Sequence, residues 1–254
     1  MNRFLTPIGQ VTISYLSSLG AFTRLTWETI CSIGKFHLGR TLHQASLLGV
    51  NSLIIVLTIS LFTGMVMTYQ LAHEFVKYGA QSALGGMIFI SMGRELGPVL
   101  TGITVAGRVG AAITAELGSM KVTEQLDALE VRASPPVSYL VLPRLIACVC
   151  MLPILIGFSV AIGTLGGYFV SVNYTDITGQ IFLDSIQLLT ATDDLTAGII
   201  KGFFFGGIIA LVGCYKGIHA APGAEGVGRA TTESVVVSIM LIFICNYFLT
   251  VLLF

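Results

Sequence analysis

Four ionisable residues lie within one stretch of sequence that is long and apolar enough to cross a membrane: Arg94, Glu95, Arg108 and Glu116. A charged side chain in hydrocarbon costs about 2.5 to 3.5 kcal/mol on insertion scales, so such residues usually face a bundle interior or a water-filled cavity. Arg94 and Glu95 project about 100° apart on a helix, so each needs a partner on another segment. Lys201 lies near the start of a later apolar stretch, and pairing it with Glu95 would lower the cost of burying both charges.

Two roles are open for Arg94, Glu95 and Lys201. In a cavity between helices they would hold the zwitterionic or anionic headgroup of a lipid, whereas in a closed bundle they would form structural ion pairs. Arg108 and Glu116 are eight residues apart, which is too far for direct contact along a helix. We interpret both of them as structural charges.

The chain carries no motif for catalysis, metal binding or nucleotide binding. It lacks the G-x-S-x-G and H-E-x-x-H patterns of hydrolases, the C-x-x-C spacing of zinc and redox sites, and the Walker A phosphate loop. The four histidines lie in separate segments, and the five cysteines lie mostly in apolar runs, as expected of buried, inert thiols. We therefore expect no catalytic residue, metal site or cofactor in this chain; ATP, if used, must be bound by another subunit.

The composition is that of a polytopic membrane protein. Hydrophobic residues make up 54% of the 254 positions and charged residues only 10%, against about 25% charged in soluble domains. The formal net charge is zero, which gives no reason to expect a nucleic acid as partner. We predict an all-α integral membrane protein.

Five segments are predicted to span the membrane, because a span needs roughly 20 mostly apolar residues. They are residues 47–69, 83–118, 137–172, 195–217 and 231–254. Gly97-Pro98 interrupts the second, and since proline removes a backbone donor we expect a bend or break beside Arg94 and Glu95. Glycines in the third and fourth spans predict close helix packing.

Residues 1–45 are predicted to form interfacial amino-terminal helices, and residues 46–254 the transmembrane region of a single domain, 1–254. Apolar residues recur at helical spacing from Ile8 to Phe22, and Trp27 and basic residues follow. This pattern is typical of a helix lying along the membrane surface. The alternative is a helix packed on a soluble partner.

The sequence changes character at Ser119. Val122, Leu126 and Leu129 repeat on one helical face, and acidic residues line the face beside it. Residues 134–136, Ser-Pro-Pro, end the helix. A short amphipathic helix between the second and third spans either docks on a partner or is an ordinary solvated loop helix.

Basic residues predict the orientation. With the amino terminus in the cytosol, the inner side receives nine of them and the outer loops only Lys77; the nine are Arg3, Arg24, Lys35, Arg40, Lys121, Arg132, Arg144, Lys216 and Arg229. This asymmetry follows the positive-inside rule. The amphipathic helix would then be cytosolic and the carboxyl terminus outside.

Five motifs in order resemble the MlaE/YrbE permease family. They are RELGPV at 94–99, AGRVG at 106–110, TAELGSM at 114–120, TEQLDAL at 123–129, and GRATT at 228–232. The resemblance covers nearly the whole chain. It implies the permease subunit of an ABC transporter that moves phospholipid between the inner membrane and an extracytoplasmic MCE-domain protein.

The resemblance also implies partners and sites. We expect a homodimer with two cytosolic ATPase subunits, which bind ATP and Mg, and an MCE-domain substrate-binding protein outside. The coupling helix that meets the ATPase would present Thr123, Glu124, Gln125, Leu126, Asp127 and Leu129. Candidate lipid-binding residues are Arg94, Glu95, Lys201 and Tyr69, and structural charges are Arg108, Glu116 and Arg229. A bacterial inner membrane is the expected location, and a plastid inner envelope also fits.

Two other functions remain open. An ion-coupled secondary transporter would use Glu95 and Lys201 as a relay, although no internal repeat of the kind common in such transporters is visible. A non-transporting membrane scaffold would recruit cytosolic proteins through residues 119–133. The lipid ABC permease is the interpretation we carry to the structure.

Overall fold

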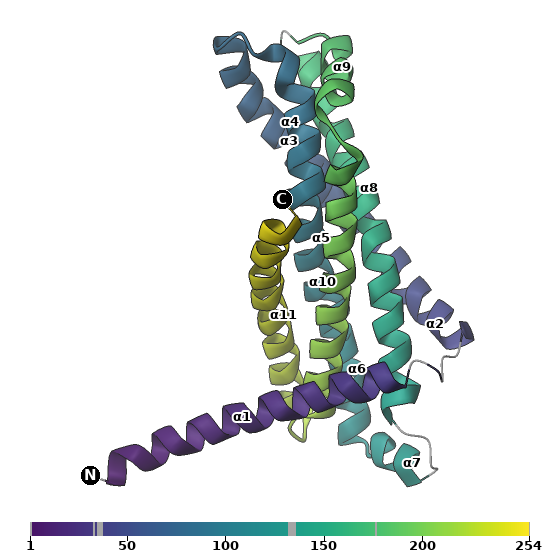
Figure 1. Ribbon diagram of the computed structural model, residues 1–254. Helices are drawn as coiled ribbons and strands as arrows, with labels where there is room; N and C mark the ends of the chain where they lie inside the picture. Colours follow the sequence, from purple (N-terminus) through teal and green to yellow (C-terminus); the bar gives the residue numbers. More distant parts are fainter. Residues whose placement is uncertain (1, 33, 35–37, 132–135, 176, 254) are drawn as a thin grey trace.

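The computed structural model describes residues 2–32, 34, 38–131, 136–175 and 177–253, and all its regular elements are helical (Figure 1). The α-helices are α1 (Asn2–Cys31), α2 (Leu38–Ala45), α3 (Asn51–Lys77), α4 (Leu84–Ser91), α5 (Gly97–Val105), α6 (Ala111–Val122), α7 (Gln125–Val131), α8 (Leu142–Tyr174), α9 (Gly179–Leu189), α10 (Thr192–Ile218) and α11 (Ala224–Leu253). Four π-helical turns lie among the described residues: Ser46–Val50, Met92–Leu96, Ala106–Gly110 and Val137–Val141.

Five membrane-length helices are present among the described residues, which confirms the five predicted spans. The first three are continuous rods that contain π-helical turns: Leu38–Lys77, Gln81–Val122 and Val137–Tyr174. The last two are the single helices Thr192–Ile218 and Ala224–Leu253. Each of the five extends past the segment predicted for it at one end or both. The last one begins at Ala224 rather than residue 231, because small residues continue the helix from a turn at Gly223, where φ is +92°.

Close helix contacts form at the predicted glycines. A side-chain carbon at Gly64 of α3 would collide with the carbonyl oxygen of Gly163 in α8. On α10, Gly198 faces the Gly93 carbonyl and Gly206 faces the Cys148 carbonyl. Backbones can approach this closely only where a side chain is missing, so these glycines set the spacing of the bundle.

Proline does not break the second span. The helix continues through the π-helical turn Met92–Leu96, and Pro98 lies in the first turn of α5. The third span has the same arrangement, with the turn Val137–Val141 before Pro143 at the start of α8. In place of the predicted bend or break beside Arg94, the helix widens locally and continues. The wider turn tolerates the backbone hydrogen bond that Pro98 cannot donate.

The long helix α1 lies across one end of the bundle and extends beyond it (Figure 1). Near its middle, the Tyr215 hydroxyl of α10 donates to the Ser18 carbonyl at 3.1 Å, and Phe22 packs edge-on against the Tyr215 ring. Leu16, Leu19 and Trp27 are more than 60% exposed. Exposed apolar side chains suit a helix in the membrane interface, so that placement stays a prediction.

Candidate functional site

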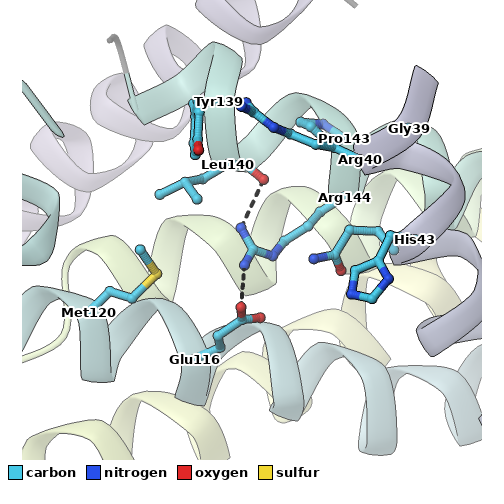
Figure 2. A pocket seen from close by; sticks show the side chains of 10 residues that line it. Gly39, Arg40, His43, Glu116, Met120, Tyr139, Leu140, Pro143 and Arg144 are labelled. Atoms are coloured by element: carbon cyan, nitrogen blue, oxygen red, sulfur yellow. Dashed lines mark hydrogen bonds and ion pairs between the residues drawn. The ribbon is translucent and has the colours of Figure 1, made fainter. Parts of the chain in front are cut away.

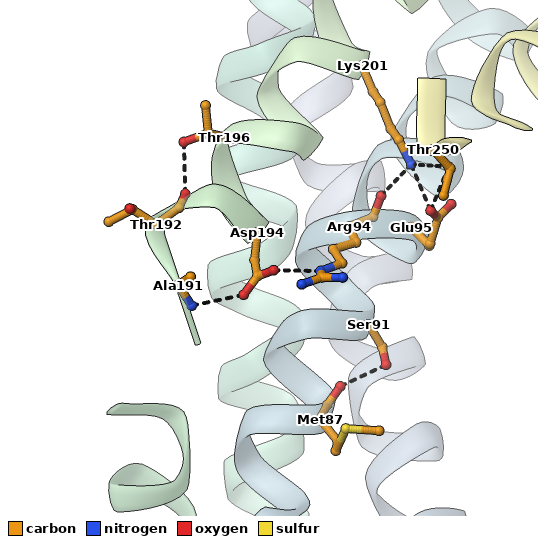
Figure 3. A network of polar contacts seen from close by, with 10 residues as sticks. All are labelled: Met87, Ser91, Arg94, Glu95, Ala191, Thr192, Asp194, Thr196, Lys201 and Thr250. Atoms are coloured by element: carbon orange, nitrogen blue, oxygen red, sulfur yellow. Dashed lines mark hydrogen bonds and ion pairs between the residues drawn. The ribbon is translucent and has the colours of Figure 1, made fainter. Parts of the chain in front are cut away.

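A network of charged residues joins three spans where α11 ends. The π-helical turn Met92–Leu96 contributes Arg94 and Glu95, and α10 contributes Asp194 and Lys201. The last turns of α11 add polar groups. Figure 3 shows Lys201 and Thr250 converging on Glu95, with Arg94 turned the other way toward Asp194.

Lys201 is completely buried, and all of its hydrogen-bond capacity is used. Its ammonium donates to Glu95 Oε1 at 2.8 Å, to Thr250 Oγ1 at 2.8 Å and to the Arg94 carbonyl at 2.7 Å. An ammonium has three donors, so none is left in this arrangement. The predicted pair between Glu95 and Lys201 is confirmed, and Lys201 holds Glu95 from behind.

Proline explains why the Arg94 carbonyl is available. In an α-helix this carbonyl would accept from the N–H of the residue four positions later, which is Pro98, and proline has no N–H. A buried carbonyl without a donor is costly, and Lys201 supplies the missing donor from the neighbouring helix. Pro98 and Lys201 thus form one unit although they lie on different helices.

Glu95 is held on both carboxylate oxygens. Oε1 meets Lys201 and Thr250, and Oε2 accepts from the Asn246 side-chain amide at 2.7 Å. The Glu95 side chain is nevertheless 39% exposed. It is therefore a fixed carboxylate that a molecule from outside the bundle can reach.

Arg94 pairs with Asp194, a partner that the sequence analysis did not identify. Arg94 Nε lies 2.5 Å from Asp194 Oδ1, and Asp194 Oδ2 accepts from the Ala191 N–H at the start of α10. The Asp194 side chain is 1% exposed and that of Arg94 is 37% exposed. The sequence held one signal for this contact: Asp194 directly precedes the apolar stretch 195–217 and lies in the first turn of α10, where an acidic residue is favoured.

The three predicted structural charges have different surroundings. Glu116 Oε1 lies 2.8 Å from Arg144 Nη2, which joins the second and third spans. Arg229 pairs with Glu233 at 3.0 Å. Arg108 is exposed and forms no ion pair within the part of the chain that the structure describes.

Tyr69 does not join the other candidate lipid-binding residues. It is 64% exposed and lines a separate hollow between α3 and the end of α8, together with His73 and Tyr174. The structure thus brings Arg94, Glu95 and Lys201 together and leaves Tyr69 apart. Any contact of Tyr69 with lipid stays a prediction.

The amphipathic helix forms as α7, after a turn in which Glu124 has a φ of +58°. Thr123, Glu124, Gln125 and Asp127 are exposed. Leu126 is only 4% exposed because it packs into the core of this chain, with Leu129 partly buried beside it. Leu126 therefore anchors α7 to the bundle, and the exposed polar residues form the surface available to a partner.

These features define a polytopic α-helical membrane protein with a polar network among its spans; no His, Cys, Asp and Glu cluster suited to a metal occurs among the described residues. The family model for the permease MlaE matches residues 41–252. The chain belongs to the MlaE permease family, and it is a membrane permease subunit.

Relatives agree with this assignment. The chain is 47% identical to the probable ABC transporter permease protein slr1045 of Synechocystis over 221 residues, 87% of this chain and 84% of the relative. It is 39% identical to a probable ABC transporter permease protein of Rickettsia felis over 249 residues, 97% of this chain and 96% of that one. It is also 39% identical to the chloroplastic protein TRIGALACTOSYLDIACYLGLYCEROL 1 of Arabidopsis thaliana over 217 residues, 85% of this chain and 62% of the plant protein.

Proposed function

We propose that this chain is the membrane-spanning subunit of an ABC transporter that moves phospholipid or a related lipid, driven by a separate ATPase. Membership of the MlaE permease family and relatives named as probable ABC transporter permeases support this. The Arabidopsis relative bears the name of a galactolipid. The chain has no Walker A motif, so ATP and Mg would be bound by the partner.

The headgroup contacts Arg94 and Glu95 in this proposal. Both side chains are more than one-third exposed, whereas Lys201 and Asp194, which hold them, are buried. A guanidinium makes strong hydrogen bonds with phosphate, and a carboxylate beside it suits the ammonium of a zwitterionic headgroup. Lys201 and Asp194 are positioning residues. The half-exposed, rigidly held pair of Arg94 and Glu95 within a membrane span is the observation that carries the proposal.

Exposed surfaces on this chain support the partners that the family resemblance implies. The exposed residues Glu124, in the turn before α7, and Gln125 and Asp127, on α7, would contact the ATPase in the cytosol. Met240, Phe243 and Tyr247 on one face of α11 are each more than half exposed. Of the five spans, α11 is the least buried. That face would pack against a second copy in a homodimer, and an MCE-domain protein would receive or deliver lipid on the opposite side of the membrane from the ATPase.

Equilibrium binding of a phosphatidylcholine with a fluorescent acyl chain to the full-length protein tests the lipid site. We expect Arg94→Gln to weaken binding by about tenfold or more, since a hydrogen bond to a charged group contributes about 1.5 to 3 kcal/mol. Arg24→Gln is the matched control, because Arg24 is exposed on α1 and pairs only with Glu28 among the described residues. Equal affinities of the wild type and Arg94→Gln would remove the assignment of the headgroup contact.

A further inference from the structure

A second polar groove lies at the other end of the second span, where that span meets the first span and the start of the third. It consists of two adjoining hollows of about 370 and 220 Å³, which share Gln44 and Glu116. Glu95 and Glu116 are separated by 21 residues of one helical rod, or about 30 Å at 1.5 Å per residue. The groove is therefore distinct from the site formed by Arg94 and Glu95.

Three arginines line this groove. The guanidinium of Arg40 lies 3.6 Å from the centre of the Tyr139 ring, which fixes its position. Arg144 lies at the back of the larger hollow, and Arg108 is exposed in the smaller one. Among the residues that the structure describes, Glu116 is the only carboxylate lining either hollow, so three positive charges face one negative charge.

One nitrogen of Arg144 has no acceptor among the described residues, although the residue is only 2% exposed. Its Nη1 donates to the Leu140 carbonyl at 2.9 Å, and its Nη2 pairs with Glu116. Its Nε has no hydrogen-bond partner within the part of the chain that the structure describes. Figure 2 shows the Arg144 guanidinium between the Leu140 carbonyl and Glu116, with the helix that carries Gly39 and His43 to one side. The Nε nitrogen is itself buried, so Arg144 contributes positive charge to the groove and not a direct contact with a molecule in it.

The groove is continuous with an apolar surface. Leu47 and Leu48 line the smaller hollow together with Arg108. Leu47 is 47% exposed, and Val50 and Ile54 on the same first span are 62% and 73% exposed. A ligand with an anionic head and an apolar tail would match both parts, whereas a free anion would leave the apolar part unused.

We propose that this groove binds the headgroup of an anionic phospholipid from the leaflet at the α2 end of the bundle. The phosphate lies between Arg40 and Arg108, with the buried Arg144 behind them. The acyl chains lie along Leu47, Val50 and Ile54. Under the predicted orientation this is the cytosolic leaflet, where anionic lipids attract basic residues. The site neither needs nor excludes transport of the lipid it holds.

Competition between two lipids tests the proposal. The full-length protein is incubated with equal amounts of phosphatidylglycerol and phosphatidylcholine, and the bound lipids are counted by native mass spectrometry. We expect a preference for phosphatidylglycerol that falls about 25-fold in the double variant Arg40→Gln/Arg108→Gln, since each basic residue contributes about fivefold. The double variant Arg24→Gln/Arg229→Gln removes the same charge from positions more than 80% exposed and should keep the preference.

Four results would overturn the proposal. An equal loss in the control pair would mean unspecific attraction, and full displacement of the lipid by millimolar inorganic phosphate would mean a site for a free anion. Conversion of a dimer to a monomer by Arg40→Gln/Arg108→Gln, with lipid retention unchanged, would make the groove an interface between copies. Loss of the preference in Arg94→Gln would place the anionic lipid at the site formed by Arg94 and Glu95. If only the proposed function of that site is wrong, the preference for phosphatidylglycerol stays intact.

Discussion

At the scale of single residues, the polar network depends on a proline and a lysine that lie on different helices. Pro98 removes the donor for the Arg94 carbonyl, and Lys201 replaces it while also holding Glu95. Membrane helices tolerate proline where a neighbour satisfies the freed backbone group. The same lysine thus stabilises the irregular turn and presents the carboxylate.

Removing the charge of Glu95 alone should destabilise the protein more than removing the charges of Glu95 and Lys201 together. Glu95→Gln leaves Lys201 charged and fully buried, and breaking a buried pair in this way costs about 3 kcal/mol or more. The double variant Glu95→Gln/Lys201→Met removes the stranded charge. It also removes the donor to the Arg94 carbonyl, but an unpaired carbonyl costs about 1 to 3 kcal/mol, less than a stranded buried charge. The double variant should therefore unfold at a higher temperature than Glu95→Gln alone. Thermal unfolding of the purified protein in detergent measures both.

The exposed pair of Arg24 and Glu28 serves as the control for that experiment. Its side chains are 81% and 42% exposed, and exposed ion pairs contribute about 1 kcal/mol or less. Neutralising both should change the unfolding temperature little. If the double variant at Glu95 and Lys201 proves less stable than Glu95→Gln, the ammonium is not stranded and our account of the network is wrong.

Predictions of single contacts from the sequence succeeded where the depth of two residues in the membrane was enough to pair them. Glu95 and Lys201 could be paired because each is a charge within an apolar span, and opposite charges at one depth lower each other's burial cost. Asp194 was missed because its burial depends on where α10 begins. The Glu116 contact with Arg144 was missed because it depends on how the second and third spans pack, which periodicity does not determine.

At the scale of elements, glycine contacts fix the distance between α3 and α8. Gly64→Ala would place a methyl group against the Gly163 carbonyl. This carbonyl belongs to the backbone of α8, so it cannot move aside as a flexible side chain could. Overpacking of this kind costs about 1 to 3 kcal/mol. Gly157→Ala is the control on α8, because nothing lies within 4 Å of its added carbon.

The unfolding temperature distinguishes these two variants. We expect Gly64→Ala to lower it and Gly157→Ala to leave it unchanged or raise it, since alanine favours a helix over glycine by about 1 kcal/mol. Equal effects of the two substitutions would mean that helix propensity, rather than the contact between α3 and α8, determines the outcome.

The short helix α7 divides into an anchor and an exposed surface. Its amphipathic pattern predicted a helix correctly, but the pattern alone could not say whether Leu126 faces a partner or its own chain. The structure places Leu126 in the core and Asp127 at the surface. The charge of Asp127, which lies 3.0 Å from Lys121, is therefore the better probe of a partner.

Asp127→Lys should weaken association with the ATPase subunit by about tenfold or more, because a reversed charge meets a surface complementary to the original one. Co-purification of the ATPase with the tagged permease measures this association. Asp184→Lys makes the same change at an exposed position on α9, at the opposite end of the bundle (Figure 1). Normal ATPase recovery with Asp127→Lys would remove α7 from the proposed interface.

At the scale of the whole molecule, the second span joins the two proposed sites and the coupling helix. Glu95 lies near the end of α11, the arginine groove lies further along the same rod, and α7 follows it directly. A five-span helical architecture could be predicted from the sequence because hydropathy and length decide it. The partners were expected only from the resemblance to the permease family, since an ATPase, a second copy or an MCE-domain protein leaves no more than an exposed surface on this chain.

ATP-driven lipid transfer is the most direct test of the central claim. The permease and its ATPase are reconstituted in liposomes, and release of a fluorescent phospholipid to the MCE-domain acceptor is followed with and without ATP. We predict transfer that requires ATP and falls at least tenfold in Arg94→Gln, with ATPase association intact. Transfer by the permease alone under an ion gradient, or undiminished ATP-driven transfer in Arg94→Gln, would contradict the account.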